Sequence, residues 1–288
     1  MSGVDTVIEG VLLGGVYALF ALGLSLIFGI MRLVNLAHGD LTLLAAYLVL
    51  SVTTTLGLSL VTSTLLVIVV MFAAGFALQR LVLERVLGGD ILPPLLVTFG
   101  LSVVIQNGLL LGYGADSRRL QAGALESSSI ELWPGLSVGL APLLALFTAI
   151  IAVALMQLIF YRTSLGRAFR AAADDPQIAQ LMGIDEPSVY AIAVGISLAV
   201  SVIAAITFGI RANFDPSIGP ARLLYAFEAV IIGGLGSLWG TLAGGIVLGL
   251  AQAIGARINP EWQILAGHLA FLAMLTVRPR GLFPSRRP

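Results

Sequence analysis

Long apolar runs separated by short polar stretches dominate the chain. The region 224–254 is too long and too rich in glycine for one straight helix, and 262–277 is a shorter apolar run. A helix needs roughly 20 apolar residues to cross a membrane. Six runs approach or exceed that length: 7–30, 39–56, 59–79, 91–114, 139–160 and 188–210. The pattern predicts an all-α polytopic membrane protein, a single transmembrane domain over 1–288 with eight or nine membrane segments.

Composition supports lipid as the solvent of this chain. Hydrophobic residues make up 58% and charged residues only 10%, against about 25% charged residues in a typical soluble domain. The net charge of zero gives no basic face for a nucleic-acid partner. The chain has no cysteine and only two histidines, so disulfides and thiolate metal sites are excluded.

Arginine placement predicts the orientation. If the loops after the first, third and fifth segments share a side with the C-terminus, that side holds ten of the 15 cations. We therefore expect the N-terminus outside and the C-terminus in the cytoplasm. The start of the chain has no basic region or cleavage site of a signal peptide, so the first segment should remain a membrane helix. The loop 115–138 is then external and the loop 161–187 cytoplasmic.

The same topology requires the region 224–254 to enter the membrane and leave it again. Its middle, GGLGSLWGTLAGG (residues 233–245), contains the plausible reversal. Gly233, Gly234 and Gly236 permit the backbone to turn, and the pair Gly240 and Gly244 has the spacing of close helix packing. We expect a broken or re-entrant segment here. Contact between substrate and exposed backbone is a secondary possibility.

A short stretch near residue 35 places Asn35, His38, Gly39 and Asp40 between two apolar segments. One interpretation is a helix–turn–helix at the cytoplasmic end of the first segment, with Asn35 and Asp40 capping backbone groups. The other is a broken helix that lines the transport pathway, with His38 and Asp40 near a gate. A metal or catalytic pair is a weaker alternative, because no third ligand has a recognisable spacing.

Other polar residues within the apolar segments allow similar alternatives. Gln106 and Asn107 could bond across helices or line the pathway. Glu228 is a solvated or ion-paired residue in one interpretation and a pathway residue in the other. His268 is expected to be neutral and hydrogen-bonded to a neighbouring helix.

The cytoplasmic loop 161–187 contains two helix signals. The first starts near Thr163 or Ser164. The second has Asp175 as its N-cap, Pro176 in the first helical position and Gly183 just past its end. Its apolar residues have the spacing of one helix face, which either lies on the bilayer or fits a groove of a cytoplasmic subunit. The candidate docking residues are Arg167, Arg170, Ala171, Asp174, Asp175, Gln177, Ile178, Leu181, Met182 and Gly183.

Four stretches resemble, in order, the branched-chain amino acid permeases of ATP-binding cassette (ABC) importers. They are GLSLIFGIMRLVNLAHGDLTLLAAY (residues 23–47), LVTFGLSVVIQN (96–107), RTSLGRAFRAAADDPQIAQLMGI (162–184) and AFEAVIIGGLGSLWGTLAGGIVLG (226–249). The third resembles the ATPase-coupling loop, although RAAADDP stands where other importers start with Glu-Ala-Ala. The length of the chain resembles the shorter of the family's two permease paralogues.

The resemblance implies an ABC importer permease fold in a bacterial cytoplasmic (inner) membrane. It implies inward transport of branched-chain or related amino acids, with no enzyme activity and no cofactor in this chain. ATP and Mg²⁺ would bind a partner, since no Walker motif occurs here. The implied partners are a longer second permease subunit, two cytoplasmic ATPase subunits and a periplasmic or extracellular substrate-binding protein.

Three other functions stay open at this level. Related permeases carry urea, short amides or sugars. An ion-coupled secondary transporter would need a carboxylate deep in a span, for which Asp40 and Glu228 are the candidates. An intramembrane enzyme would need a nucleophile and base or a metal set, and the sequence offers none that stands out.

Overall fold

The computed structural model describes residues 3–87, 90–133 and 136–283. Seven of the described helices are long and apolar enough to cross a membrane. The elements are α1 (Gly3–Met31), α2 (His38–Leu56), α3 (Leu60–Leu81), η1 (Leu83–Arg85), α4 (Leu92–Tyr113), α5 (Ala124–Ser127), β1 (Ser129–Trp133), β2 (Leu136–Gly139), α6 (Leu140–Arg162), α7 (Ser164–Asp174), α8 (Pro176–Leu181), α9 (Glu186–Arg211), α10 (Gly219–Gly233), α11 (Leu238–Ile258) and α12 (Trp262–Val277).

The predicted helical, multi-pass class is confirmed, whereas the predicted count of eight or nine segments is not. Helices α10 and α12 have 15 and 16 residues, which is short of a full crossing. The sequence predicts an all-α fold, with 115–138 as an external loop. Instead, β1 and β2 pair antiparallel there, with Ile130 opposite Val138. Alternating polar and apolar residues over 129–132 favour a strand.

Local signals in the sequence explain where several helices begin. Ser59 caps α3 by accepting a hydrogen bond from the backbone N–H of Thr62. Ser237 caps α11 in the same way through Gly240. Prolines occupy the first or second position of α4, α9 and α10, where the missing N–H costs nothing.

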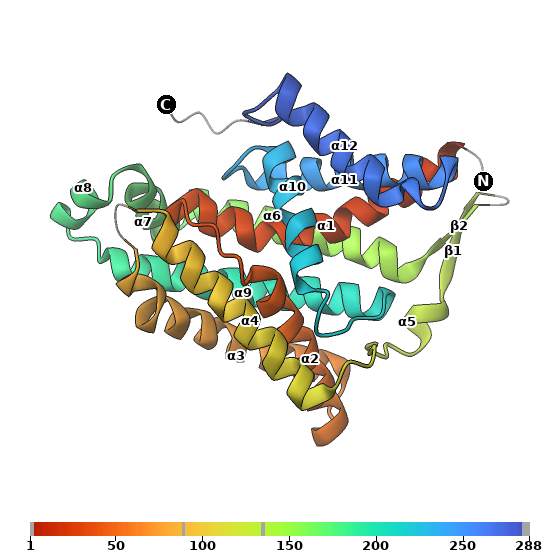
Figure 1. Ribbon diagram of the computed structural model, residues 1–288, viewed down its shortest axis with the longest axis horizontal. Helices are drawn as coiled ribbons and strands as arrows, with labels where there is room; N and C mark the ends of the chain where they lie inside the picture. Colours follow the sequence, from red (N-terminus) through yellow and green to blue (C-terminus); the bar gives the residue numbers. More distant parts are fainter. Residues whose placement is uncertain (1–2, 88–89, 134–135, 284–288) are drawn as a thin grey trace.

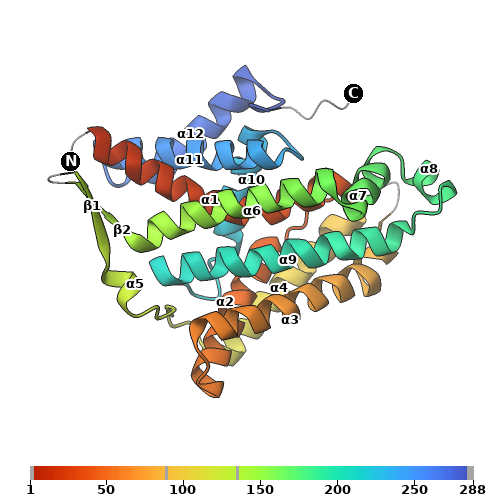
Figure 2. The same cartoon turned by 180° about the vertical axis from the view of Figure 1, so that it is seen from behind.

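Helices α1, α6, α9 and α11 lie side by side along the long axis of the molecule, and α2, α3 and α4 form a second group against α9 (Figure 1). One end of this bundle carries the start of α1 and the hairpin β1–β2. The other end carries α7 and α8, as Figure 2 shows from behind. We call these the N-terminal end and the loop end.

Close packing of α1 against α11 depends on glycines from both helices. A Cβ on Gly14 would lie 2.4 Å from the Cα of Ile246, and one on Gly249 would lie 2.3 Å from the carbonyl oxygen of Gly10. Neither distance is compatible with a side chain, so the two backbones meet directly. Small residues permit such contacts between membrane helices. This pair was not part of the sequence-based expectations.

The expected break within 233–245 is present. Helix α10 ends at Gly233, and the turn to α11 uses positive φ angles of 108° at Gly234 and 79° at Gly236. A Cβ on Gly244 would lie 2.0 Å from the carbonyl oxygen of Ala229, so α10 and α11 pack as a tight helical hairpin. The backbone N–H of Phe283 donates to the carbonyl oxygen of Gly233, which holds the end of the described chain at this turn.

Candidate functional site

Asp40 is fully buried where α2, α4 and α10 meet. Its Oδ2 accepts a hydrogen bond of 2.6 Å from the hydroxyl of Ser102, and its Oδ1 accepts one of 3.1 Å from Nε2 of Gln106. A Cβ on Gly219 would lie 2.1 Å from Oδ1, so only glycine fits at the start of α10. Among the described residues, no cation lies within 4.0 Å of this carboxylate. Neutral donors from α4 therefore hold it.

The Asp40 group lies deep in the helix bundle and not at its end. The Nε2 atom of His38 lies 3.2 Å from the carbonyl oxygen of Phe20. Phe20 precedes the end of α1 at Met31 by eleven residues, about 16 Å along a helix axis. After α1 the chain turns at Arg32, which has a positive φ of 53°. It then runs back along the bundle without helical structure before α2 begins.

This geometry corrects the first of the two interpretations of residues 35–40. The region is not a turn at the end of α1, and Asp40 does not cap a helix: its carboxylate bonds to α4. The capping expectation for Asn35 is confirmed, because its Oδ1 accepts a hydrogen bond from the backbone N–H of Ala37. Gly39 is required for close packing, since a Cβ there would lie 2.2 Å from the carbonyl oxygen of Gly219.

The two neighbouring amides on α4 have different environments. Gln106 points into the Asp40 group. Asn107 is exposed, and its side chain bonds only to the carbonyl oxygen of Val103 on its own helix. The structure thus brings Gln106, and not Asn107, together with the polar residues of α2. No cluster of three or more metal-ligating side chains occurs within the described ranges.

A second buried polar group joins α10 to α12. Oε1 of Glu228 and Nδ1 of His268 lie 2.5 Å apart, and Glu228 is only 2% exposed. Of the two alternatives for Glu228 outside a pathway, solvated or ion-paired, the structure shows a buried residue paired with His268. The expectation that His268 bonds to a neighbouring helix is confirmed. Close by, the hydroxyl of Tyr17 donates a hydrogen bond of 2.5 Å to Oε1 of Gln252, linking α1 to α11.

Helix α7 is anchored firmly to the end of α6. Thr163 caps α7 by accepting a hydrogen bond from the backbone N–H of Gly166. A Cβ on Gly166 would lie 2.2 Å from the carbonyl oxygen of Ile159, so the two helices touch through their backbones. Arg170 donates to the carbonyl oxygen of Phe160. Phe169 is fully buried in the main core. Movement of this loop would therefore be transmitted to α6.

The short helix α8 has the predicted ends. Asp175 accepts hydrogen bonds of 3.0 Å from the backbone N–H groups of Gln177 and Ile178, Pro176 opens the helix, and Gly183 follows it with φ 82°. The apolar face points away from the protein, with Ile178, Leu181 and Met182 being 59%, 86% and 79% exposed. Most other candidate docking residues are exposed as well: Arg167, Asp174, Asp175, Gln177 and Gly183. Arg170 and Ala171 are half-buried.

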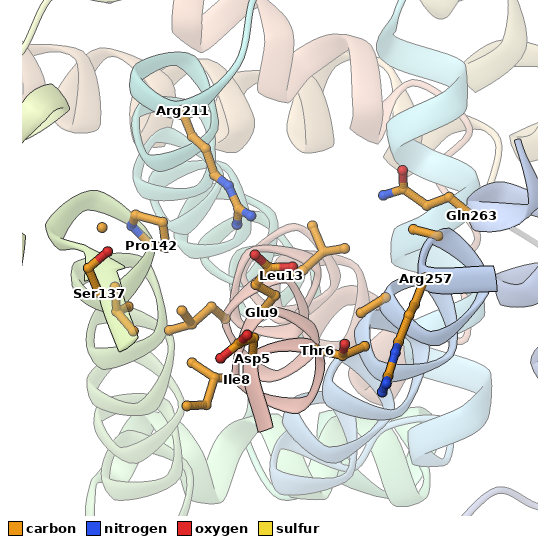
Figure 3. Close-up of a pocket in the computed structure, with 15 residues that line it drawn as sticks. Asp5, Thr6, Ile8, Glu9, Leu13, Ser137, Pro142, Arg211, Arg257 and Gln263 are labelled. Atoms are coloured by element: carbon orange, nitrogen blue, oxygen red, sulfur yellow. The ribbon is translucent and has the colours of Figure 1, made fainter. Parts of the chain in front are cut away.

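A cavity of about 620 Å³ opens at the N-terminal end, a feature that the sequence analysis did not predict. Apolar residues of α1 form one wall, including Leu12 and Leu13. In Figure 3 the guanidinium of Arg211 and the carboxylate of Glu9 point toward one another across this space. We call it the N-terminal cavity. Its charged and amide residues are Asp5, Glu9, Arg211, Arg257 and Gln263.

A second cavity, of about 960 Å³, lies at the loop end between α1, α6, α7 and the α10–α11 turn. Arg32 and Arg170 contribute its positive charge, and Tyr161 and Trp239 its aromatic surface. Each end of the bundle therefore has a hollow with charged residues. The buried polar groups of Asp40 and Glu228 are located within the helix bundle.

A multi-pass helical bundle in which α2 and α10 begin beside a buried carboxylate is an arrangement typical of membrane transport subunits. The chain belongs to the family described as branched-chain amino acid transport system permease components, whose family model matches residues 6–277. That match includes every residue of the Asp40 group, the α7–α8 loop and the Glu228 group.

Curated relatives agree with this assignment. The high-affinity branched-chain amino acid transport system permease protein BraD of Pseudomonas aeruginosa is 27% identical over 96% of this chain and 94% of its own length. LivH of Escherichia coli K12, a permease protein of the same description, is 29% identical over 95% of this chain and 93% of its own length. LivM of the same organism is 26% identical over 95% of this chain but only 69% of its own length.

A solved structure gives independent support for the fold. The chain aligns with a chain of PsaBC from Streptococcus pneumoniae, determined in complex with Fab, with a TM-score of 0.52 and 11% identity. The alignment covers 95% of this chain and 92% of that chain. The predicted family is confirmed by the family match and the relatives, and the fold by the structural similarity.

Proposed function

We propose that this chain is the shorter permease subunit of an ABC importer that moves branched-chain amino acids into the cytoplasm. A longer permease, two ATPase subunits and a substrate-binding protein complete the assembly. Mg²⁺ and ATP bind the ATPase subunits and not this chain. The names of the relatives support the substrate and the paired permeases, and the pattern of arginines supports a cytoplasmic loop end.

The exposed apolar face of α8 is the observation that carries the energy coupling. Leu181 is 86% exposed at the tip of a loop that is bonded rigidly to α6. A short helix with an apolar face fits a groove on another protein. In our proposal the ATPase dimer binds α8. When ATP closes that dimer, α7 and α6 move together as one rigid body. The Asp40 group and the α10–α11 break then lie among the helices that must rearrange.

Copurification tests this proposal directly. Tagged wild type and tagged Leu181→Arg are each expressed together with the other subunits of the proposed importer and purified in mild detergent. We expect an ATPase to copurify with wild type and to be lost with Leu181→Arg, because a charge then occupies the docking face. Leu125→Arg is the matched control, since Leu125 is also exposed but lies in α5 near the other end of the bundle.

Two results would contradict the proposal. If no nucleotide-binding subunit copurifies with wild type in several detergents, ATP coupling through this chain fails, and Asp40 becomes a candidate site for a coupling ion. If the ATPase stays bound to Leu181→Arg but leaves Leu125→Arg, then α8 is not the docking element. ATP-dependent uptake of leucine, against urea, acetamide and ribose, by vesicles containing the full assembly tests the substrate class.

A further inference from the structure

The N-terminal cavity combines charged groups of both signs with an apolar wall. Arg211 enters from the end of α9 and Glu9 from the first turns of α1, while Leu12 and Leu13 supply the apolar surface. The volume of about 620 Å³ falls within the range of about 300–1,000 Å³ that is usual for small-molecule sites. Neither the family match nor the names of the relatives assign a ligand to this place.

Two of its charged groups, Arg211 and Glu9, face one another without forming an ion pair. Figure 3 shows the Arg211 guanidinium and the Glu9 carboxylate directed into the same space. No salt bridge within 4.0 Å joins them. Nη1 of Arg211 is buried and has no hydrogen-bond partner among the described residues. A buried guanidinium nitrogen without a partner is costly, and a ligand carboxylate would supply the missing acceptor.

We infer that the N-terminal cavity binds the zwitterion of a free aliphatic α-amino acid. The ligand carboxylate lies on Arg211, its ammonium group on Glu9, and its side chain against Leu12 and Leu13. A free amino acid carries its carboxylate and its ammonium group on the same carbon atom, so it can bridge an acid and a base that do not touch. This inference rests on the proposed function, because it makes the permease itself a receiving site for the transported substrate.

Direct binding tests this inference without the rest of the assembly. The full chain in lipid nanodiscs is titrated with radiolabelled L-leucine in the absence of binding protein and ATP. We expect saturable binding, weakened about tenfold or more by Arg211→Gln and by Glu9→Gln. Arg118→Gln and Glu261→Gln are the matched controls, since both residues are exposed and lie outside the cavity lining. They should bind leucine as wild type does.

Ligand analogues separate the two charge contacts. Leucinamide lacks the carboxylate, and 4-methylpentanoate lacks the ammonium group. Each should compete at least about tenfold more weakly than leucine. Leucinamide should lose little further affinity on Arg211→Gln, because its missing carboxylate has already removed that contact. Equal competition by leucine and either analogue would overturn the assignment.

A labelling experiment covers the case in which a charge variant fails to fold. The chain has no cysteine, so Ser137→Cys places a single thiol on the cavity lining. Leucine should slow maleimide labelling of that thiol, and 4-methylpentanoate should not. Unchanged labelling with saturating leucine would contradict binding in this cavity.

The remaining outcomes keep this inference distinct from the proposed function. If wild type binds no leucine while the full assembly takes up leucine with ATP, the cavity inference fails alone. If the assembly transports no amino acid, the proposed function fails. If the charge variants bind leucine normally but no longer capture the substrate-binding protein, the cavity is a protein-docking surface and the inference is overturned.

Discussion

The carboxylate of Asp40 on α2 and the hydroxyl of Ser102 on α4 are joined by a hydrogen bond of 2.6 Å, deep within the helix bundle. Gln106 adds a second hydrogen bond between the same two helices. Removing the acceptor leaves the buried Ser102 hydroxyl without its acceptor and Gln106 with only its 3.5 Å hydrogen bond to Ser102. A buried unsatisfied group costs about 1–3 kcal/mol. We therefore expect Asp40→Ala to lower the thermal unfolding temperature of the purified chain measurably.

The unfolding temperatures of the Asp40 variants should follow a fixed order. Asp40→Asn keeps the shape and one acceptor, so its unfolding temperature should fall between wild type and Asp40→Ala. Asn107→Ala is the control, because Asn107 is exposed and bonds only within α4. An unfolding temperature of Asp40→Ala equal to that of Asn107→Ala would show that the Asp40 group does not stabilise the fold.

The contact between Glu228 and His268 predicts an energetic coupling of α10 with α12. Hydrogen bonds between membrane helices contribute about 0.6 kcal/mol on average and reach about 1.7 kcal/mol. We expect a coupling free energy in that range from a double-mutant cycle of Glu228→Gln and His268→Ala. The measurement is reversible unfolding of each variant in mixed micelles. Additive effects of the two substitutions would contradict a direct interaction.

The backbone contact of α1 with α11 predicts that Gly14 tolerates no side chain. In Gly14→Ala the new Cβ would meet the backbone of Ile246, so the helices must separate and lose packing. We expect a clear drop in unfolding temperature. Gly112→Ala on α4 is the matched control, since no atom lies within 4 Å of a Cβ at that position. That control should be neutral or slightly stabilising, because alanine favours a helix by up to about 1 kcal/mol over glycine.

Single cysteines test the orientation of the two ends. Ser137 lies at the N-terminal end and Ser164 at the start of α7, and both are exposed. We expect a membrane-impermeant maleimide to label Ser137→Cys in intact spheroplasts. Ser164→Cys should react only after permeabilisation. The reverse pattern would invert the topology that the arginines predict and would exclude α8 as a cytoplasmic docking helix.

Much of the fold follows from local patterns in the sequence. The long apolar runs predicted most of the spans because a membrane helix must satisfy its own backbone. Asp175, Pro176 and Gly183 predicted both ends of α8, since capping depends on residues a few positions apart. The glycines of 233–245 predicted the break between α10 and α11, because positive φ angles favour glycine.

The tertiary structure decided what depends on distant residues. The sequence left Asp40 as either a helix cap or a residue near a gate of the transport pathway. Only the approach of α4 and α10 to α2 placed its carboxylate against Ser102, 62 positions away. The sequence likewise predicted neither the contact of Glu228 with His268 nor the position of Glu9 and Arg211 in one cavity. Hydrophobic periodicity identifies helices, but depth in the bundle and partners across it are set by how those helices pack.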